Sequence, residues 1–432
     1  MFKDRGRELA FLERLVGKPT LLVMYGRRRV GKTELLKEFA RKTGAIYLLA
    51  RRESKKDQLD KLSREMASAL KDGSLNERPF PSYDALFEYI AGIKKPVIFD
   101  EFPYLVESSP ELPSVLQDHW DNRLSKGGSY IVLCGSSVSM MEGLLGYKSP
   151  IYGRRTEQLL LEPLSFEDAR EFLPGPIERQ VEAYAVLGGT PGYLLELEGG
   201  LERTIKKKIL QKNSFLGRDP EFVLREELSE PRNYFSIIKA VARGKTSLGE
   251  ICSDTGLSRG LVVKYLSVLS DLQIIERRVP FGAKRDSRKG IYLLRDNYFR
   301  FWFRFAFENF EYIEQGLQDR LYREIITPRL DAFVGRAFEE ICLSWARGEY
   351  ERPFSSWWGG EDEIDGVAKG VLLEAKWKRM SAGEARKALD RLKEKAHRAG
   401  FKGKRVLCVK GFSSRPRLYE GERAVTVREM FK

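Results

Sequence analysis

Eight residues near the N-terminus have the types and spacing that hold a nucleoside triphosphate. They read GRRRVGKT and fit the phosphate-loop pattern G-x-x-x-x-G-K-[ST] at every defined position. In such a loop backbone N–H groups surround the phosphates, the lysine reaches the β- and γ-phosphates, and the threonine hydroxyl binds Mg²⁺. The residues expected to bind ATP are Gly26, Arg27, Arg28, Arg29, Val30, Gly31, Lys32, Thr33 and Glu34. The alternative is a glycine turn at a helix start with an accidental lysine.

Two adjacent acids end the apolar run KPVIFDEF at residues 95–102. In phosphate-loop proteins such a strand lies beside the loop and its first acid holds the magnesium shell, a role that we assign to Asp100. Glu101 is the candidate general base that orients and deprotonates the attacking water. An isolated Asp-Glu pair is usually a solvated turn, but the preceding phosphate loop favours the catalytic interpretation.

Two later segments could contact the γ-phosphate. Residues 129–137 (SYIVLCGSS) are apolar and become polar at the C-terminal end, where ligands bind in parallel sheets, so Ser136 or Ser137 could sense the γ-phosphate or position the water. Arg154 and Arg155 offer a guanidinium that could stabilise transition-state charge. The sequence does not decide which arginine acts. A small-residue turn and a surface arginine pair are the alternatives.

A second chemical constellation lies at residues 363–376, which read EIDGVAKGVLLEAK. Two alternating runs around a Lys-Gly turn predict a β-hairpin. Period two places Glu374 and Lys376 on one face, and Asp365 reaches that face from the neighbouring strand. The two carboxylates can hold Mg²⁺ or Mn²⁺ that polarises a phosphodiester, while the lysine stabilises the developing charge or activates water. Upstream, Glu339 could supply a third metal-binding acid.

The elements that must position the first set are a strand at residues 20–25 and a helix at 34–41, on either side of the phosphate loop. In this order the motifs resemble the archaeal ATPase family of the AAA+/STAND division. The resemblance rests on the phosphate loop, DEFPYL, LCGSS, YGRR and GGTPGYL, and spans roughly half the chain. It implies a parallel-sheet core followed by a helical lid with Gly189, Pro191 and Tyr193, and an arginine contact from Arg154 or Arg155.

The C-terminal constellation resembles the PD-(D/E)xK nuclease superfamily, in the divergent form found as a domain of unknown function on archaeal ATPases. The residues that carry the resemblance are Glu339, on a helix expected to open at Gly335, Asp365, and the pair Glu374-x-Lys376. The proline that usually precedes the first acid is replaced by Ile364. A nuclease-like fold that binds nucleic acid without cleaving it, or a surface salt-bridge cluster, is the alternative.

Between these regions, residues 233–281 predict three short helices followed by an extended segment and a basic loop, the pattern of a winged helix-turn-helix. Ser258 is expected to cap the third helix, with Arg259 and Lys264 available for phosphates. The basic residues of the wing are Lys284, Arg285, Arg288 and Lys289. The alternative is a winged helix that only packs against the core or mediates assembly.

Positive charge is concentrated at the C-terminal end. The chain has a net charge of +14, and the segment from Trp377 to Lys432 holds 17 lysines and arginines against 6 acids, a net +11. Such a surface attracts polyanions, nucleic acid first among them. The alternative is a solvated helix face, because six of the basic residues are expected on one amphipathic helix: Arg386, Lys387, Arg391, Lys393, Lys395 and Arg398.

Length and composition favour an α/β multidomain protein. The 432 residues, 42% of them hydrophobic, suit about three domains or more. We expect a phosphate-loop core at 1–165, a helical lid at 166–230, a winged helix at 231–310 and a nuclease-like α/β domain at 311–432. Neither an apolar run of about eighteen residues nor an apolar signal region is present, which favours a cytoplasmic protein without a membrane segment. The four cysteines show no metal-ligand or disulfide spacing and are expected as buried thiols: Cys134, Cys342, Cys252 and Cys408.

Two function classes follow. The first is an ATP-hydrolysing protein that acts on nucleic acid, DNA in preference to RNA, with a metal-dependent nuclease centre. The second is a nucleotide-controlled signalling or assembly switch, homo-oligomeric in a nucleotide-dependent way, whose C-terminal domain is not catalytic.

Overall fold

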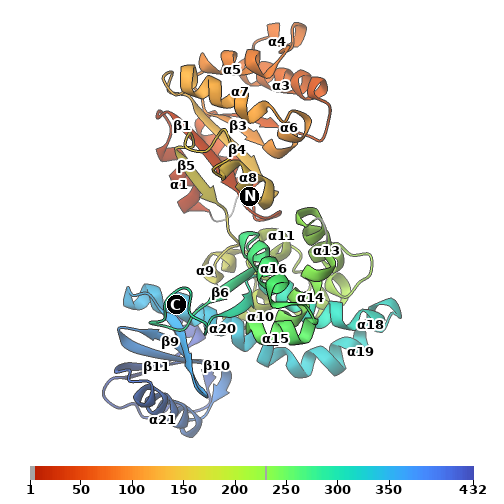
Figure 1. Cartoon of the computed structure of the whole chain (residues 1–432). Coiled ribbons are helices and arrows are strands. Elements are labelled where there is room, and N and C mark those ends of the chain that lie inside the picture. Colours follow the sequence, from red (N-terminus) through yellow and green to blue (C-terminus); the bar gives the residue numbers. More distant parts are fainter. Residues whose placement is uncertain (1–4, 229–230) are drawn as a thin grey trace. The chain divides into compact units, whose positions relative to one another are not determined.

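The computed structural model describes residues 5–228 and 231–432, which form two compact units (Figure 1). The first unit comprises the described residues up to Pro163 together with Thr190–Gly192. The second comprises Leu164–Gly189 and Tyr193–Lys432. The predicted boundary at 230 lies outside the described residues.

The first unit is built on a five-stranded parallel sheet with the strand order β2-β3-β4-β1-β5. The central strands are buried along their whole length, which explains why they read as continuous apolar runs. The strands are β1 (Thr20–Tyr25), β2 (Ile46–Leu49), β3 (Val97–Asp100), β4 (Tyr130–Gly135) and β5 (Glu157–Leu160).

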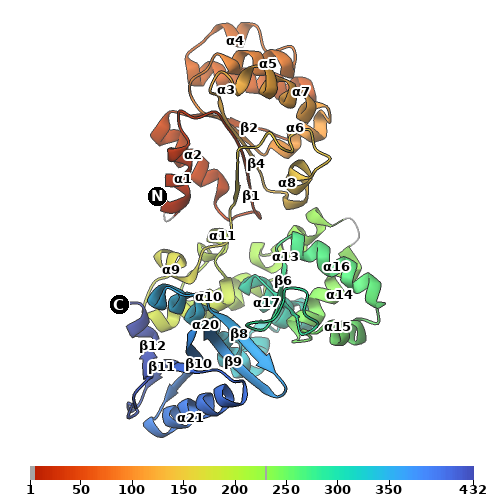
Figure 2. The same cartoon turned by 60° about the vertical axis from the view of Figure 1, so that its left-hand side comes forward.

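Helices cover both faces of this sheet, with α1 and α2 on one side and α6 and α8 on the other (Figure 2). Leucines of α1 and Leu35, Leu36 and Phe39 of α2 pack with β1, β3 and β4 into one buried core. The helices are α1 (Gly6–Arg14), α2 (Lys32–Thr43), α3 (Lys55–Leu70), α4 (Ser74–Glu77), α5 (Tyr83–Ala91), α6 (Phe102–Ser108), α7 (Leu112–His119) and α8 (Val138–Leu145).

The second unit begins with a helical region that includes a two-stranded antiparallel sheet, β6 (Ile275–Arg278) with β7 (Ile291–Leu294). Its helices are α9 (Phe166–Ala169), α10 (Ile177–Leu187), α11 (Pro191–Leu194, which starts in the first unit), α12 (Leu201–Thr204), α13 (Phe215–Glu227), α14 (Pro231–Ala242), α15 (Leu248–Thr255), α16 (Arg259–Asp271), α17 (Asn297–Phe301), α18 (Phe310–Glu314) and α19 (Gln318–Leu321). Three helices, α14 to α16, thus precede the β6–β7 pair, in the order that the sequence predicts.

The C-terminal part of this unit is a mixed five-stranded sheet with the order β12-β11-β10-β9-β8. Strands β8 to β10 are antiparallel neighbours, and β10, β11 and β12 are parallel. Its elements are α20 (Thr327–Tyr350), β8 (Ser355–Gly359), β9 (Asp362–Ala368), β10 (Gly370–Met380), α21 (Ala382–Arg398), β11 (Gly403–Phe412), β12 (Glu422–Thr426) and α22 (Val427–Met430). Leu389 and Leu392 of α21 pack on one face of the sheet, and Phe338 of α20 contacts Trp377 of β10.

The predicted α/β multidomain fold class, with a parallel-sheet core, is confirmed. Two local predictions are wrong. The helix expected to open at Gly335 begins at Thr327, where it continues directly from a helical turn at Tyr322–Ile326, and its first turn accommodates Pro328. Ser258 does stand at the N-cap of α16, but its side chain makes no capping hydrogen bond.

Three of the cysteines are buried thiols, whereas Cys252 is only partly buried. In residues 5–228 and 231–432, no helix combines the length and the apolar character needed to cross a membrane.

Candidate nucleotide site and carboxylate centre

The phosphate loop connects β1 to α2, and its glycines fit backbone requirements that other residues would not meet. Gly31 stands at the N-cap of α2 with φ of 97°, in the left-handed region. At Gly26, a Cβ would lie 2.3 Å from the carbonyl oxygen of Leu161, so that only glycine fits there. The segment Thr190–Gly192 lies against this loop: the Gly192 N–H donates to the Arg29 carbonyl at 3.2 Å.

Lys32 closes the loop onto itself. The residue is 5% exposed, and its ammonium group donates to the carbonyl oxygens of Gly26 at 2.7 Å and Arg27 at 3.0 Å. Burial lowers the pKa of Lys32, opposed by the nearby charges of Glu101 and Asp100. The Lys32 ammonium therefore donates to two carbonyl oxygens in the place of the β- and γ-phosphate oxygens that it would bind in a nucleotide complex.

Asp100 is fully buried and accepts three hydrogen bonds. Its Oδ2 accepts from the hydroxyl of Thr33 at 2.8 Å and from that of Tyr47 at 2.5 Å, and its Oδ1 accepts from the Glu101 N–H at 3.0 Å. Thr33 and Asp100, both predicted to serve Mg²⁺, thus lie in direct contact. Hydroxyl and carboxylate oxygens are the ligands that Mg²⁺ prefers, so the residues fit the ion.

Sequence reasoning missed Tyr47. This half-buried residue of β2 lies beside β3, and burial followed by the negative charge of Asp100 raises the pKa of its phenol. Its only signal in the sequence is a polar atom in an otherwise apolar strand, which does not reveal its partner.

Glu101 lies next to Asp100, with φ of 55° in the left-handed region that non-glycine residues rarely adopt. Ser136, at the end of β4, donates to its carboxylate through Oγ at 2.7 Å and through the backbone N–H at 3.3 Å. Ser137 instead caps α8 by accepting from the Met140 N–H. Of the two predicted serines, Ser136 is therefore the one that contacts the candidate general base.

The two predicted arginines have other partners in this structure. Arg154 forms an ion pair with Asp121 at 3.0 Å, and Arg155 donates to the Leu145 carbonyl at 3.0 Å. The contacts favour neither arginine as the one that reaches a γ-phosphate.

In the second unit, the β9–β10 hairpin brings the predicted carboxylates together. The register pairs Leu373 with Gly366, and its continuation by one residue sets Glu374 opposite Asp365, which accepts from the Ala375 N–H at 2.8 Å. The two acids are 5% and 8% exposed, and the ammonium of Lys376 lies 2.8 Å from Glu374 Oε1 and 3.8 Å from Asp365 Oδ2. Lys395 of α21 approaches Glu374 at 3.4 Å, so this residue, predicted as part of a basic helix face, belongs to the carboxylate centre.

Two of the acids in this centre hold their protons more strongly than an exposed carboxyl does. Burial and the charge of Asp365 raise the pKa of Glu339 to about 8. Burial and the charge of Glu374 raise the pKa of Asp365 to about 6. Burial opposes the charge on Lys376, but the two neighbouring acids raise its pKa overall. A divalent cation would relieve this repulsion between carboxylates.

No group of three or more histidine, cysteine, aspartate or glutamate side chains in the described part of the chain is arranged to hold a metal ion. Asp365 and Glu374 remain as a pair, and Mg²⁺ is commonly bound by one or two carboxylates together with water and substrate phosphate. These two residues therefore fit Mg²⁺ or Mn²⁺, whereas Glu339 does not complete a ligand set with them.

Comparison with known proteins finds one family match in each half of the chain. Residues 2–197 match the model of an ATPase domain predominantly from Archaea, and residues 302–388 match a model described as "Archaea bacterial proteins of unknown function". The uncharacterized protein MJECL04 of Methanocaldococcus jannaschii is 32% identical over 419 residues, which cover 93% of each chain. The uncharacterized ATP-binding protein MJ0423 of the same organism is 56% identical over 41 residues, 9% of this chain and 70% of that protein.

Among solved structures, the Walker-type ATPase PABY2304 of Pyrococcus abyssi is 23% identical, with a TM-score of 0.50 over 70% of this chain and 96% of that chain. This similarity shows that the two proteins share a fold.

Proposed function

Because this chain belongs to the family of ATPase-domain proteins found predominantly in Archaea, we propose that it binds and hydrolyses ATP with Mg²⁺ and acts on nucleic acid, DNA in preference to RNA. The observation that carries the proposal is the connected set of side chains behind the phosphate loop: Lys32, Thr33, Asp100, Glu101 and Ser136.

Each member of this set has a task in the proposed hydrolysis. Lys32 exchanges its two carbonyl partners for phosphate oxygens, since charged acceptors attract an ammonium group more strongly. Thr33 turns its hydroxyl from Asp100 towards the ion, while Tyr47 keeps the Asp100 carboxylate in place. Glu101, held by Ser136, accepts a proton from the attacking water. Mg²⁺, when bound, would neutralise charge that develops on the phosphates.

We also propose a metal-dependent nuclease centre at Asp365, Glu374 and Lys376. The specific observation in its favour is that two buried carboxylates and a lysine, distant from the phosphate loop in sequence, converge on one face of a hairpin. The carboxylates would bind Mg²⁺ or Mn²⁺, and Lys376 would stabilise charge on the scissile phosphate. Glu339 would tune the charge of the site from α20.

For the remaining regions we keep the assignment of 1–165 to the ATPase core, 166–230 to a lid, 231–310 to a winged helix and 311–432 to the nuclease-like domain. Helices α14 to α16 and the β6–β7 pair support the winged helix-turn-helix. A winged helix and a basic C-terminal part on one chain favour a nucleic-acid substrate over a purely protein-binding switch.

The deciding experiment measures cleavage of labelled single-stranded, duplex and branched DNA with Mg²⁺ or Mn²⁺, with and without ATP. The variants are Glu374→Ala and Lys32→Ala, and Glu420→Ala, which changes an exposed acid before β12, is the matched control. Cleavage that is lost in Glu374→Ala and kept in Glu420→Ala supports the nuclease. Unchanged ATP turnover in Lys32→Ala would contradict the ATPase assignment.

Two other outcomes are informative. Salt-sensitive DNA binding without cleavage would leave an ATP-dependent nucleic-acid binder whose C-terminal fold is not catalytic. Neither binding nor cleavage, together with a change of oligomeric state on adding ATP, would support the alternative of a nucleotide-controlled assembly switch.

A further inference from the structure

The loop that connects β6 to β7 docks on the edge of the C-terminal sheet. Within this loop, residues 279–290, the Phe281 N–H donates to the Ser356 carbonyl of β8 at 2.9 Å. The indole N–H of Trp358, also in β8, donates to the Lys289 carbonyl at 3.0 Å. The Phe281 ring contacts Phe401, which in turn contacts Trp357, with ring centroids 5.9 and 5.4 Å apart. The loop, which adjoins β8 in Figure 2, is therefore fixed to the C-terminal sheet at three points.

Hydrogen bonds from Arg277 of β6 hold the backbone of the loop in place. The guanidinium of Arg277 donates to the carbonyl oxygens of Arg285 and Ser287, inside the loop. A Cβ at Gly290 would lie 2.4 Å from that guanidinium, so a larger residue at this position would displace the Arg277 side chain. Because these two hydrogen bonds go to backbone oxygens of the loop, they leave the side chains of the loop free to face solvent.

Those side chains are basic. Lys284, Arg285, Arg288 and Lys289 are all exposed, with Asp286 as the one acid among them. Three aromatic rings anchor the loop beside a hollow of about 740 Å³ at the end of α21. Phe401 is one of these rings and also lines the hollow. Exposed Lys393 and Lys402 also line this hollow. The loop and the end of α21 thus form one basic corner of the C-terminal sheet.

The carboxylate centre lies close to this corner. Arg398, at the end of α21, forms a two-pronged ion pair with Asp362 at 2.7 and 2.8 Å. Asp362 opens β9, three residues before Asp365, a separation of about 10 Å at the usual rise per residue. A phosphodiester backbone held at the corner can therefore reach Asp365 within a few nucleotides.

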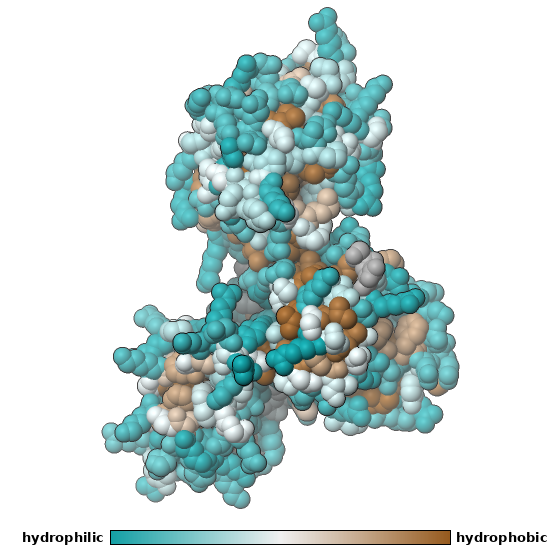
Figure 3. Space-filling model, in the orientation of Figure 1, coloured by the Kyte–Doolittle hydropathy of each residue, from teal (hydrophilic) through white to brown (hydrophobic). Residues whose placement is uncertain are grey.

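Helix α16, the third helix of the predicted winged helix, is a weaker candidate for the same ligand. Its exposed face carries two cations, Arg259 and Lys264, alongside Leu261 and Val263, which are 41% and 46% exposed. In Figure 3, apolar side chains reach the surface around α14 to α16. A face of this composition suits contact with protein at least as well as contact with a polyanion.

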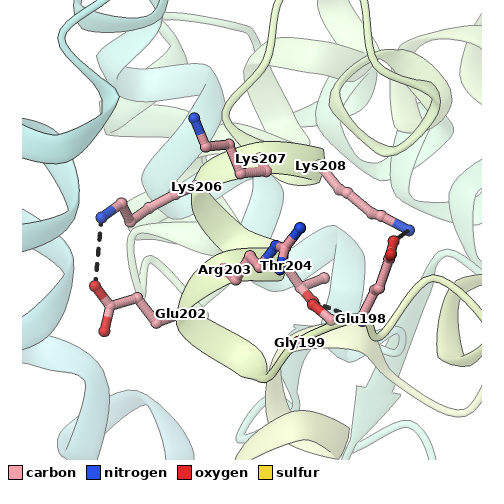
Figure 4. Close-up of a pocket in the computed structure, with 8 residues that line it drawn as sticks. All are labelled: Glu198, Gly199, Glu202, Arg203, Thr204, Lys206, Lys207 and Lys208. Carbon is pink, nitrogen blue, oxygen red and sulfur yellow. Dashed lines mark hydrogen bonds and ion pairs between the residues drawn. The ribbon is translucent and has the colours of Figure 1, made fainter.

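Another basic hollow, of about 590 Å³, contains Lys206, Lys207 and Lys208 (Figure 4). There Lys206 is neutralised by Glu202 and Asp319, and Lys208 by Glu196 and Glu198. The hollow at the end of α21 also contains acids, Asp390 and Glu394, but the loop beside it carries four exposed cations against one acid, Asp286.

We propose that duplex DNA binds through its backbone to the basic corner formed by loop residues 284–289 and the end of α21, that the corner directs it towards Asp365 and Glu374, and that α16 is peripheral. This proposal rests on the proposed action on nucleic acid. Duplex is favoured over single-stranded DNA because Phe281, Trp357 and Phe401 pack against one another and are not free to stack on bases.

The test measures the affinity of the full chain for a duplex DNA oligonucleotide as a function of salt. Three variants each remove two exposed positive charges: Lys284→Ala/Arg288→Ala, Lys393→Ala/Lys402→Ala, and Arg259→Ala/Lys264→Ala on α16 as the matched control. Each lost phosphate contact should reduce the slope of log affinity against log salt by about 0.9. Each corner pair should therefore lower the slope by about two, and the α16 pair should leave it unchanged.

The possible outcomes separate this inference from the function on which it rests. Failure of the unmodified protein to bind duplex DNA at low salt would refute the nucleic-acid function itself. Binding by the unmodified protein that is lost in the α16 pair and kept in both corner pairs would overturn the corner alone. Circular dichroism of the variants verifies that they are folded.

Discussion

Replacing Glu101 by glutamine separates two roles that its carboxylate could have in ATP hydrolysis. Glutamine has nearly the same shape and can still accept hydrogen bonds from Ser136, but it cannot take a proton from water. If Glu101 only anchors Ser136, the change replaces the charged acceptor of the Ser136 hydrogen bond by a neutral one. The cost should then be about 1 kcal/mol, or about fivefold in rate. If Glu101 is the general base, turnover should fall by about 10²- to 10⁴-fold, which corresponds to roughly 2.7–5.4 kcal/mol.

Steady-state ATPase turnover and ATP affinity, measured together, distinguish the two roles. Because Glu101 lies outside the phosphate loop, ATP binding should be unchanged while kcat falls at least a hundredfold. Glu107→Gln is the control: Glu107 lies on α6, the helix that follows Glu101, and pairs with Arg52 at 3.0 Å. A Glu101→Gln protein that binds ATP normally and keeps a tenth or more of its turnover would refute the general-base assignment.

Three further predictions concern buried polar groups. Tyr47→Phe removes a donor from the buried Asp100 carboxylate and should cost about 1.5–3 kcal/mol in urea unfolding of the first unit; no loss would contradict the geometry. Arg300→Met should stabilise the second unit by about 1–4 kcal/mol in thermal unfolding, because the three buried guanidinium nitrogens of Arg300 have no hydrogen-bond partner among the described residues; Arg304→Met, on an exposed arginine, should give no gain. The pKa of Glu339 is about 8 in the folded state and about 4.5 in the unfolded state, so between these pH values only the folded protein holds the proton. The folded protein therefore loses stability as pH rises from 4.5 to 8, by at most about 1.4 kcal/mol per pH unit. Glu339→Gln should flatten that dependence in unfolding measured from pH 5 to 8, and an unchanged slope would argue against the raised pKa.

Local patterns in the sequence were sufficient to predict many of the residues of both centres. The phosphate loop falls between a strand and a helix as expected, since both flanks carry their own periodicity. The hairpin turn fixes the register that sets Asp365 opposite Glu374, because in an antiparallel pair the turn determines every partner.

Contacts between segments distant in sequence were not predictable in this way. Tyr47 meets Asp100 across fifty-three residues, and Lys395 meets Glu374 across twenty-one. Neither pair leaves a spacing signal in a single sequence, since each depends on which strands or helices become neighbours. The docking of Phe281 on Phe401 has the same origin: each ring alone reads as an ordinary hydrophobic residue of a loop.

The brief return of Thr190–Gly192 to the first unit affects how separable the two units are. The chain passes from one unit to the other three times, after Pro163, after Gly189 and after Gly192. A protease cut after Pro163 would release residues 1–163 without the segment that packs on Arg29. A fragment meant to hold the complete first unit therefore has to extend past Gly192, and the span of the family model to residue 197 meets this requirement.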